Sequence, residues 1–527
     1  MNGADAIQPA GQIVSWIRSH APEGAHLRID SREIGHGDVF LALPGRRDDG
    51  RLHVTDAIAR GAAAIVAESS PAGVPDSAVP TLQVENLAAQ LPAVGAAFYR
   101  DPTARLLTIG VTGTNGKTSC SHWIAQVLTA CGRRCAVIGT VGSGFPGALA
   151  ADAALTTPDA IGLQRTARAL LDAGAKALAM EVSSIGLDQG RTAATRFDLA
   201  LLTNLTRDHL DYHGSMAEYE RAKARLFDEP SLAQAVLNLD DEFGRRLAHR
   251  CRARELRTTG YRVQGAAPAG AVDAAQVDCE LSGESVVLGT DQIRFEARVQ
   301  RAGAPALTVP VCAPVIGRFN VSNVLGVFGI ALAAGIEVHD AARALQGLRP
   351  PPGRMQRVEV ESGEAAGLDL PLVLIDYAHT PDAIEQALAA LRPVAQARAG
   401  RLWIVFGAGG DRDPGKRPQM GAAAARGADR IVVTSDNPRG EDPGRIIGQI
   451  IAGAGQAGAR LSHDTDRALA ITRTVLRADP ADVVLIAGKG HEPYQEVAGR
   501  RLPFSDLHCA QTALRRRAGL APEQASR

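Results

Sequence analysis

The sequence is poor in aromatic residues and has no excess of charge of either sign. Phe, Trp and Tyr make up 4% of its 527 residues, and 57 Lys and Arg residues balance 57 Asp and Glu residues. A chain without a basic field and with few stacking side chains is not expected to bind nucleic acid or an anionic membrane surface. We therefore expect small-molecule substrates as partners, with no nucleic-acid partner and no membrane partner.

Long apolar runs and cysteine pairs are missing as well. No apolar stretch approaches the roughly 20 residues of a membrane-spanning helix, and the first residues, MNGADAIQPAGQIVSW, lack the basic and apolar regions of a signal peptide. The seven cysteines are odd in number and contain no Cys-x-x-Cys pair, which is typical of free thiols in a reducing compartment. These absences predict a cytoplasmic protein. We also expect a monomer.

Strands and helices are predicted to alternate along most of the chain. A chain of this length is too long for one hydrophobic core, so several domains are expected. Residues 1–105 contain short strands and turns, and from Leu106 the pattern changes to strand, glycine-rich turn and helix. The segment GLRPPPGRM (347–355) has three consecutive prolines, which cannot lie inside a helix or a central strand and so indicate a linker. Beyond it the alternation of strands and helices starts again.

A phosphate-binding turn opens the second region. The stretch GVTGTNGKTS (110–119) follows an apolar strand and starts an amphipathic helix, but Val111 stands where a P-loop usually has its first glycine. Glycines let backbone N–H groups approach phosphates, Lys117 can neutralise the β- and γ-phosphate oxygens, and Thr118 can hold Mg²⁺. The alternative is a glycine-rich turn that merely joins a strand to a helix. We favour an ATP site made by Gly113, Thr114, Asn115, Gly116, Lys117, Thr118 and Ser119.

These patterns predict an α/β protein with mainly parallel sheets and right-handed crossovers. We expect three domains: a small α/β N-terminal domain (1–105), a central P-loop-type ATPase domain with a mainly parallel sheet (106–348) and a Rossmann-like C-terminal domain (349–527). Residues 262–312 differ, because their short strands are joined by Gly, Ala and Ser. We interpret them as an antiparallel excursion from the central domain.

Two polar residues come directly after predicted strands of the central domain. Glu181 lies in AMEVSSIGLDQGR and His209 lies in LTNLTRDHLDYHG. Because ligands of α/β sheets bind at the carboxyl ends of the strands, both side chains could reach Mg²⁺ and the γ-phosphate beside Lys117. A purely structural role for both residues is the alternative.

The variant loop TGTNGKT resembles that of the Mur ligase family, the cytoplasmic ATP-dependent amino-acid ligases of peptidoglycan synthesis, and the same loop type occurs in folylpolyglutamate synthases. The resemblance extends from about Ile29 to Asp506 and depends on ordered motifs in different domains. It implies catalytic roles for Lys117, Glu181, His209 and Lys223. It also implies Mg²⁺ binding by Thr118, Glu181, His209 and Lys223, the last after carbamylation by CO₂.

Without the resemblance, Lys223 in YERAKARLF is an ordinary solvated helix lysine. Carbamylation requires a neutral amine, so we expect burial or nearby positive charge to lower the pKa of Lys223. The resemblance further implies that Asn323 in GRFNVSNVLG contacts adenine and that Arg354 and Asp376 close over the nucleotide. Their plain alternatives are a helix asparagine, a linker arginine and a turn aspartate.

The motif DNPR (436–439) follows a strand of the C-terminal domain. By itself it is a turn with a solvated arginine, although Arg can grip a carboxylate with two hydrogen bonds and Asp can pair with an ammonium. The motif resembles that of diaminopimelate-adding Mur ligases, whereas lysine-adding relatives lack the arginine. The diaminopimelate-binding residues implied by the resemblance are Arg412, Asp436, Asn437, Pro438, Arg439, Gly488 and Glu492.

The nucleotide-sugar substrate is expected to begin in the first domain, in the segment RIDSREIGHGDVFLALPGRRDDGR. The resemblance implies a UDP-sugar-binding domain there, and Leu155 departs from the asparagine often found near the peptide end of this substrate. The implied contacts with UDP-MurNAc-dipeptide are Ile29, Ser31, Arg46, Arg47, Asp48, Thr156, Thr157, Ser183, Gln189 and Arg191.

Together the resemblance implies ATP-dependent ligation of meso-2,6-diaminopimelate to the D-Glu of UDP-MurNAc-L-Ala-D-Glu through an acyl phosphate. The implied cofactors are ATP, Mg²⁺ and a CO₂-derived carbamate on Lys223. The alternatives are a lysine-adding or folylpolyglutamate synthase-like ligase, against which Arg412 and Arg439 argue, and a P-loop regulator that makes no product. We also expect domain closure, because Arg354 and Asp376 must reach a nucleotide held by the central domain.

Overall fold

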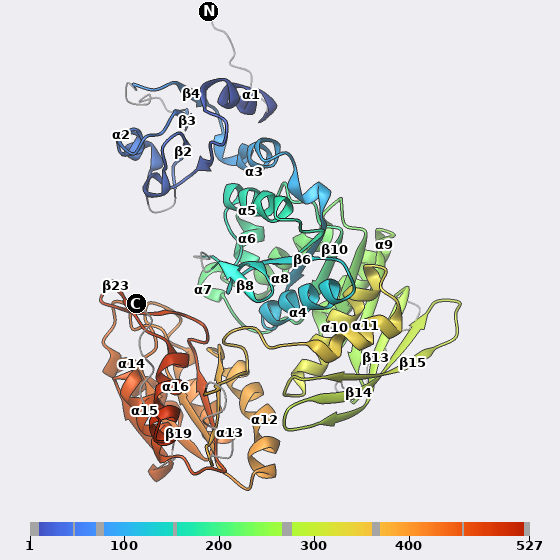
Figure 1. The fold of residues 1–527 in the computed structure, drawn as a ribbon, viewed down its shortest axis with the longest axis vertical. Coiled ribbons are helices and arrows are strands. Elements are labelled where there is room, and N and C mark those ends of the chain that lie inside the picture. Colours follow the sequence, from blue (N-terminus) through green and yellow to red (C-terminus); the bar gives the residue numbers. More distant parts are fainter. Residues whose placement is uncertain are drawn as a thin grey trace, which may run out of the picture.

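Three α/β units follow one another along the chain (Figure 1). The computed structural model describes residues 10–45, 48–69, 78–150, 155–265, 277–360, 369–455 and 458–520. The predicted fold class is confirmed, and each unit has a sheet that lies inside one of the predicted ranges. The boundaries at 105/106 and 348/349 stay predictions. Among the described residues, no helix has the length and apolar character that crossing a membrane requires.

The described part of the N-terminal unit forms a four-stranded parallel sheet in the order β1-β2-β3-β4. Its strands are β1 (Leu27–Arg28), β2 (Val39–Ala42), β3 (Ala64–Glu68) and β4 (Thr81–Val84). Alternate residues of the strands face α1 (Ala10–His20) and α3 (Leu87–Phe98) on one side and α2 (Val54–Ala59) on the other. Ile161 of α5 (Ala160–Asp172) joins this core, which attaches the N-terminal unit to the central one.

In the described residues, the central unit is built on one sheet of eleven strands in the order β15-β14-β13-β12-β11-β10-β5-β9-β6-β7-β8. The strands from β13 to β6 pair in parallel, and antiparallel strands extend both edges. The strands are β5 (Leu107–Thr112), β6 (Cys135–Gly139), β7 (Gly142–Phe145), β8 (Ala148–Ala150), β9 (Ala177–Glu181), β10 (Leu199–Leu202), β11 (Gln234–Asn238), β12 (Arg257–Val263), β13 (Cys279–Leu288), β14 (Ile293–Arg301) and β15 (Leu307–Ala313).

The antiparallel strands predicted within residues 262–312 are confirmed for β13, β14 and β15. They are not a separate excursion, however, because β13 pairs in parallel with β12 and so continues the main sheet. Helices cover both faces of this sheet, as a mainly parallel sheet requires. One face carries α4 (Lys117–Ala130), α10 (Phe319–Ala333) and α11 (Val338–Ala344), and the other carries α5, α8 (Met216–Ala224) and α9 (Glu242–Ala253).

The C-terminal unit has a sheet in the order β16-β17-β21-β18-β19-β20, in which β16 (Gln356–Arg357) is antiparallel and the others are parallel. A hairpin of β22 and β23 lies outside this sheet. The remaining strands are β17 (Leu372–Asp376), β18 (Leu402–Phe406), β19 (Arg430–Thr434), β20 (Leu461–Asp464), β21 (Val483–Ala487), β22 (Tyr494–Val497) and β23 (Arg500–Pro503). The helices are α12 (Pro381–Ala397), α13 (Lys416–Gly427) and α14 (Pro443–Gly453) on one face, with α15 (Arg467–Arg477) and α16 (Asp506–Arg517) on the other.

The proline-rich linker is fixed to the central unit by helix α4. Trp123 Nε1 and Gln126 Nε2 donate to the carbonyl oxygen of Arg349 at 3.1 and 3.0 Å, and the backbone N–H of Arg349 donates to Gln126 Oε1 at 2.8 Å. This attachment sets how the C-terminal unit leaves the central one. The loops after β9, β10, β17, β19 and β21 thereby line one common cleft.

Candidate active site

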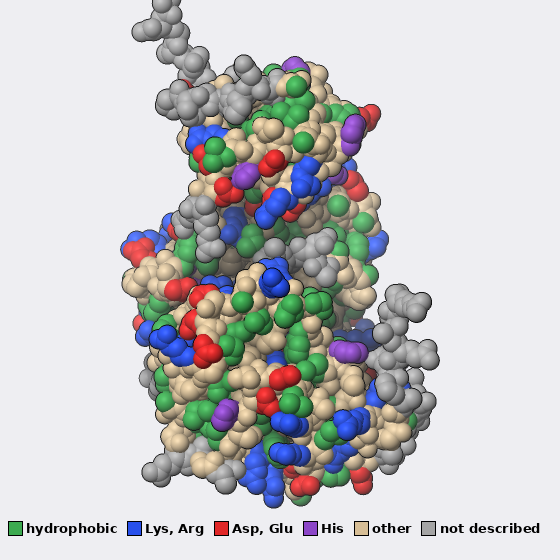
Figure 2. Space-filling model, turned by 90° about the vertical axis from the view of Figure 1, so that its left-hand side faces the viewer, with side chains coloured by type: hydrophobic (Ala, Val, Ile, Leu, Met, Phe, Trp, Pro, Cys, Tyr) green, Lys and Arg blue, Asp and Glu red, His purple; other side chains and the backbone are tan. Residues whose placement is uncertain are grey.

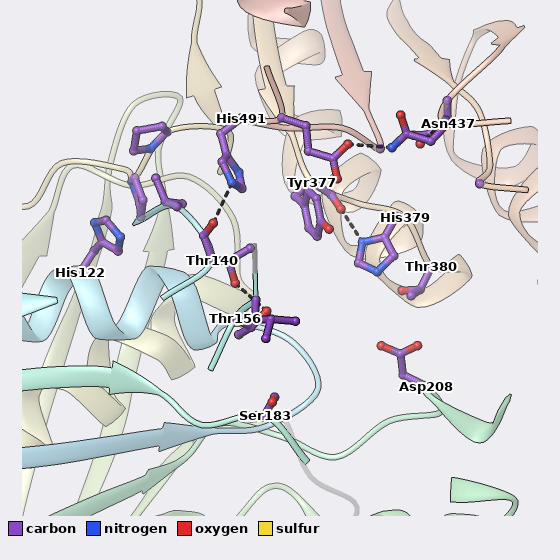
Figure 3. Close-up of a pocket in the computed structure, with 18 of the residues that line it drawn as sticks. His122, Thr140, Thr156, Ser183, Asp208, Tyr377, His379, Thr380, Asn437 and His491 are labelled. Atoms are coloured by element: carbon purple, nitrogen blue, oxygen red, sulfur yellow. Dashed lines mark hydrogen bonds between the residues drawn. The ribbon is translucent and has the colours of Figure 1, made fainter. Parts of the chain in front are cut away.

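The cleft between the central and C-terminal units has a volume of about 1900 Å³. The surface is hollowed between the N-terminal unit, at the top, and the rest of the molecule below (Figure 2). Ser183 and Asp208 of the central unit face Tyr377, His379 and Asn437 of the C-terminal unit (Figure 3). Because the carboxyl ends of both parallel sheets meet here, the cleft is the candidate active site.

The P-loop closes tightly around the first turn of α4. Gly116 has φ +86°, and a Cβ atom there would lie 2.7 Å from Asn323 Oδ1, so a side chain does not fit. The Lys117 Nζ donates to the carbonyl oxygens of Gly113 and Thr114, both at 2.9 Å. Burial lowers the pKa of Lys117, although the charges of Glu181 and Asp208 oppose this effect.

Glu181, at the end of β9, is fully buried beside the P-loop. Its carboxylate accepts hydrogen bonds from the Thr118 hydroxyl at 3.0 Å and from the N–H and hydroxyl of Thr140 at 2.8 and 3.0 Å. Because the single proton of the Thr140 hydroxyl goes to Glu181, the Thr156 hydroxyl donates to Thr140 Oγ1, which lies 3.1 Å away. One threonine after β6 thus orients both a predicted metal ligand and a predicted substrate contact. Sequence reasoning missed Thr140, whose signal was its position directly after a parallel strand.

Lys223 projects from α8 into the same region and is 1% exposed. Its Nζ donates to the Gly113 carbonyl at 2.8 Å and lies 4.6 Å from the centre of the Tyr219 ring. Burial and the charge of Lys117 hold the pKa of Lys223 well below its ordinary value. The predicted lowering of this pKa is confirmed, and a lowered pKa favours the neutral form of the amine that carbamylation requires.

His209 has φ +53° and begins the short helix α7 (Leu210–His213). Its side chain is 42% exposed to the cleft, and its Nε2 lies 3.5 Å from Asp208 Oδ2. Partial burial lowers the pKa of His209 to about 4, with the charges of Lys117 and Lys223 adding to the effect and Asp208 opposing it. The imidazole is therefore neutral at neutral pH and can act as a ligand or an acceptor.

Contacts between units close the side of the cleft that carries the P-loop. Arg354 Nη2 donates to Thr118 Oγ1 at 3.1 Å, and its guanidinium lies 4.3 Å from the centre of the Tyr377 ring. Asp376 accepts from the N–H groups of Met355 at 2.8 Å and of Ala378 at 2.9 Å, so it orients the backbone that carries Arg354. Burial raises the pKa of Asp376, and the charge of Arg354 opposes this.

Two asparagines make contacts between the P-loop and helices of both units. Asn323 is 7% exposed on α10 and donates to Asn320 Oδ1 at 3.0 Å, with its own Oδ1 beside Gly116. Asn115 Nδ2 donates to Asp382 on α12 at 3.3 Å. The central and C-terminal units therefore touch around the P-loop. Whether they move on ligand binding stays a prediction.

The DNPR motif forms the opposite wall of the cleft. Asp436, Asn437 and Pro438 are buried, whereas Arg439 reaches the cleft with 25% of its side chain exposed. Arg439 Nη1 donates to the Gly410 carbonyl at 2.7 Å, and its Nε lies 3.3 Å from Glu496 Oε2. These contacts leave one terminal nitrogen of the guanidinium without a hydrogen bond to a described residue.

The other residues predicted to bind diaminopimelate are Gly488, Glu492 and Arg412, and all three line the cleft. Gly488 and Glu492 line the cleft beside Asn437, whose Nδ2 donates to Glu492 Oε2 at 2.8 Å. Arg412 is 57% exposed and lies 3.9 Å from Asp211 of the central unit, across the cleft. Exposed ion pairs of this kind contribute little to stability, so Arg412 is free to exchange Asp211 for a ligand.

The predicted dipeptide contacts form a connected set in the central unit. Thr157 Oγ1 donates to the Glu181 carbonyl at 2.9 Å and accepts from the Ser183 N–H at 2.9 Å. Arg191 donates to the Thr157 carbonyl at 2.8 Å and to Gln189 Oε1 at 2.6 Å. Thr156, Ser183 and Arg191 line the cleft, whereas Thr157 is fully buried beneath it.

The predicted uridine contacts lie in the N-terminal unit and do not line this cleft within the described residues. Ile29 follows β1 and is 38% exposed, and Ser31 begins a short helical turn and is 8% exposed. Asp48 accepts a hydrogen bond from His53 at 2.8 Å. Arg46 and Arg47 lie outside the described residues.

Lys489 and His491 were also missed by sequence reasoning, although both lie in the GKGH segment after β21. Lys489 is fully buried and contacts Asn437 and Glu492. His491 Nε2 lies 3.1 Å from the Thr140 carbonyl, a bond that joins the two walls of the cleft (Figure 3). Burial and the charge of Arg354 lower the pKa of His491 to about 4, so the neutral ring donates through Nε2.

Comparison with known families agrees with this geometry. Residues 25–99 match the Mur ligase family catalytic domain, residues 111–331 match the Mur ligase middle domain, and residues 353–490 match the Mur ligase glutamate ligase domain. A UDP-N-acetylmuramoyl-L-alanyl-D-glutamate--2,6-diaminopimelate ligase of Ralstonia nicotianae is 48% identical over 513 residues, which cover 95% of each chain. The chain belongs to the Mur ligase family.

Further relatives of this Mur ligase have the same name. The ligase of Pseudomonas aeruginosa is 48% identical over 499 residues, covering 93% of this chain and 94% of the relative. A solved structure of a diaminopimelate ligase is 33% identical, covers 93% of this chain and 94% of that chain, and superposes with a TM-score of 0.60. MurF from Acinetobacter baumannii, at 19% identity and a TM-score of 0.64 with 91% and 95% coverage, shares the fold.

Proposed function

We propose that this Mur ligase joins meso-2,6-diaminopimelate to the D-Glu of UDP-MurNAc-L-Ala-D-Glu, using ATP and forming UDP-MurNAc-tripeptide, ADP and phosphate. The observation that carries the proposal is the position of Arg439, which lines the same cleft as Ser183 and His209. A second carboxylate distinguishes diaminopimelate from lysine, and a guanidinium is well suited to bind it. The names of the relatives support the same assignment.

The reaction has two steps. The side-chain carboxylate of D-Glu attacks the γ-phosphorus of ATP, the bond to the β,γ-bridging oxygen breaks, and ADP and an acyl phosphate form. The neutral amine of diaminopimelate then attacks the acyl carbon, and phosphate leaves as the amide bond forms and the nitrogen loses a proton. Lys117 and the N–H groups at the start of α4, from Gly116 to Ser119, would hold the phosphate oxygens, because the N–H groups of Thr114 and Asn115 already donate to Asn204. This stabilisation of developing negative charge is the largest expected contribution to the rate.

The oxygens of Thr118 and Glu181 fit a Mg²⁺ site, because they lie 3.0 Å apart beside the phosphate-binding turn. Mg²⁺ commonly takes one or two protein oxygens and keeps water and phosphate oxygens as its other ligands. No cluster of three or more His, Cys, Asp or Glu side chains with metal-binding geometry occurs among the described residues, so phosphates would complete the coordination. The ion would supply charge neutralisation for the transferring phosphate.

A second ion is proposed at Glu181, His209 and the carbamate of Lys223. The fit is supported by the neutral imidazole of His209 and by the buried amine of Lys223, whose pKa is lowered by burial and by the charge of Lys117. A carbamate would convert this amine into an anion whose oxygens suit Mg²⁺. On this proposal, the carbamate of Lys223 adds a negative charge near the ammonium of Lys117.

The nucleotide would lie between the central and C-terminal units. Asn323, which lies beside Gly116, would contact the base, and Arg354 reaches the P-loop hydroxyl of Thr118. Asp376 acts on the nucleotide through the backbone that carries Arg354. Thr156, Ser183, Gln189 and Arg191 of the central unit are proposed for the dipeptide, and the buried Thr157 would act through its hydrogen bonds to Ser183 and Arg191. The residues proposed for the uridine end are Ile29, Ser31, Arg46, Arg47 and Asp48.

The amino-acid pocket combines charges of both signs. Arg439 would bind the distal carboxylate of diaminopimelate, with Arg412 as a second cation. Glu492 and Asp436 would receive an ammonium, and Asn437, Pro438 and Gly488 shape the wall between them. A zwitterionic diacid diamine is complementary to this arrangement, whereas lysine leaves Arg439 without its carboxylate.

Gly488→Ala is expected to raise the KM for diaminopimelate about 10- to 100-fold, because misplacement by about 1 Å is costly in a binding site. Gly488 has φ +114°, and a Cβ atom there would lie 2.6 Å from Asp436 Oδ2. The matched control is Gly499→Ala, at φ +74° with nothing within 4 Å of its Cβ position. Both variants should lose about 1 kcal/mol of stability from backbone strain, measured by thermal unfolding. Equal KM values for diaminopimelate in the two variants would contradict the expected effect of the clash at Gly488.

The proposed function is tested by phosphate release from ATP with each substrate omitted in turn. Release is expected only when ATP, UDP-MurNAc-L-Ala-D-Glu and meso-diaminopimelate are all present. Replacing diaminopimelate by L-lysine should reduce kcat/KM at least about 100-fold, because a buried site built for a polar group rejects an analogue that lacks it. Equal turnover with lysine would indicate a lysine-adding ligase, and release without either substrate would indicate an ATPase of another kind.

We also propose that the reaction takes place in the cytoplasm and that the chain acts as a monomer. All seven cysteines are free thiols in the structure, which supports a reducing compartment. Sedimentation at micromolar concentration would test the monomeric state.

A further inference from the structure

We infer that Lys489 is a positioning residue that sets the geometry of the amino-acid pocket by orienting Glu492 and Asn437. Lys489 follows the central strand β21 and is fully buried, at 0% exposure. Buried lysines are rare and require charged or polar partners, so its contacts have to account for its position. The inference depends on the proposed function, which makes Glu492 and Asn437 part of the diaminopimelate site.

The ammonium of Lys489 connects three segments of the pocket wall. Its Nζ donates to Asn437 Oδ1 at 3.0 Å and to Glu492 Oε2 at 2.8 Å. It also lies 5.5 Å from the centre of the Tyr494 ring, within range of a cation–π attraction. Asn437 belongs to the loop after β19, Glu492 to the loop after β21, and Tyr494 to β22. One cation therefore holds together the parts that form this side of the cleft.

The contacts of Lys489 also decide which way the Asn437 amide faces. Asn437 Oδ1 accepts from Lys489 Nζ and from the Glu496 N–H at 2.9 Å, and neither of these groups can accept a hydrogen bond. A flipped amide would place its own N–H groups against both donors. Asn437 Nδ2 is therefore directed to Glu492 Oε2, a bond visible in Figure 3.

Both bonds to Glu492 use the same carboxylate oxygen, Oε2. Among the described residues, none donates a hydrogen bond to Oε1, and Glu492 lines the cleft with 19% of its side chain exposed. Lys489 and Asn437 thus leave one oxygen of a fixed carboxylate for an ammonium of the substrate. Without Lys489, the carboxylate would lose its charged partner and the amide would lose the contact that orients it.

Lys489→Met tests this role, because methionine fills a similar apolar volume but donates no hydrogen bond. The KM for meso-diaminopimelate is expected to rise about 10- to 100-fold, the range for lost hydrogen bonds to charged groups. The kcat and the KM for ATP should stay within about threefold of wild type, because the P-loop lies on the other wall of the cleft. Lys176→Met, which removes an exposed lysine before β9, is the matched control and should change none of these values.

A double-mutant cycle distinguishes positioning through Glu492 from general loosening of the wall. If Lys489 acts through Glu492, Lys489→Met should change the KM of a Glu492→Gln enzyme by less than about threefold. Additive effects, an unchanged KM for diaminopimelate in Lys489→Met, or an equal rise in the KM for ATP would each overturn the inference.

Folding is checked by thermal unfolding and by binding of a non-hydrolysable ATP analogue. Should Lys489→Met fail to fold, Lys489→Gln keeps one donor, and its KM for diaminopimelate is expected to rise about 3- to 10-fold while the KM for ATP stays unchanged. A Lys489→Gln enzyme with wild-type KM values would overturn the inference. Wild-type enzyme without diaminopimelate-dependent phosphate release would instead overturn the proposed function itself, so the two failures are distinguishable.

Discussion

Lys223→Met is expected to lower kcat for ligation by at least about 1000-fold, because it would remove the proposed carbamate anion from the phosphate-transfer site. Methionine keeps the apolar volume of the buried side chain but cannot react with CO₂. The substitution should cost little stability, because the Gly113 carbonyl that loses the hydrogen bond from Lys223 keeps the one from Lys117 Nζ at 2.9 Å. Phosphate release and thermal unfolding measure the two effects.

The control for this prediction lies on the same helix. Arg221 is exposed on α8 and pairs with Glu218 at the surface, so Arg221→Met should leave kcat unchanged. The carbamate itself can be observed by ¹³C NMR after addition of labelled bicarbonate, as a signal present in wild type and absent in Lys223→Met. Active wild-type enzyme without such a signal, or an active Lys223→Met enzyme, would contradict the proposed carbamate.

Arg439→Ala is expected to raise the KM for meso-diaminopimelate about 100-fold, because a guanidinium–carboxylate pair with two hydrogen bonds is lost. The KM for ATP should stay within about twofold, since Arg439 lies on the wall opposite the P-loop. Turnover of L-lysine, which has no distal carboxylate, should hardly change. The preference for diaminopimelate over lysine should therefore fall by about the same factor of 100.

The contacts of Arg439 require a control for its structural role. Its guanidinium also donates to Gly410 and pairs with Glu496, so truncation could loosen the loop. Loosening would impair diaminopimelate and lysine equally, whereas loss of carboxylate recognition impairs diaminopimelate alone. Arg445→Ala removes a nearby exposed arginine of α14 and should change neither value. Equal impairment of both amino acids by Arg439→Ala would reject the assignment.

Local sequence patterns predicted the residues that lie directly after strands. The turn at 110–119 follows β5, Glu181 ends β9 and the DNPR motif follows β19, so their positions were predicted from the alternation of strands and helices, whereas the roles of Glu181 and DNPR were implied by the resemblance to Mur ligases. The carboxyl ends of parallel strands meet at one edge of a sheet, so such residues converge even when they are far apart in sequence. The sequence pattern therefore indicated the fold class and the order of the motifs, and the resemblance to Mur ligases implied most of the candidate site.

Only the tertiary structure decided which of these side chains bind each other and which are buried. Lysine is usually a surface residue, yet Lys489 is fully buried. It is enclosed because Asn437 from the loop after β19 and Glu492 from its own loop bind its ammonium. Thr140 and His491 are 351 positions apart and meet only because the two units pack around the linker. Burial and hydrogen-bond partnership depend on neighbours from distant segments, and no local periodicity contains that information.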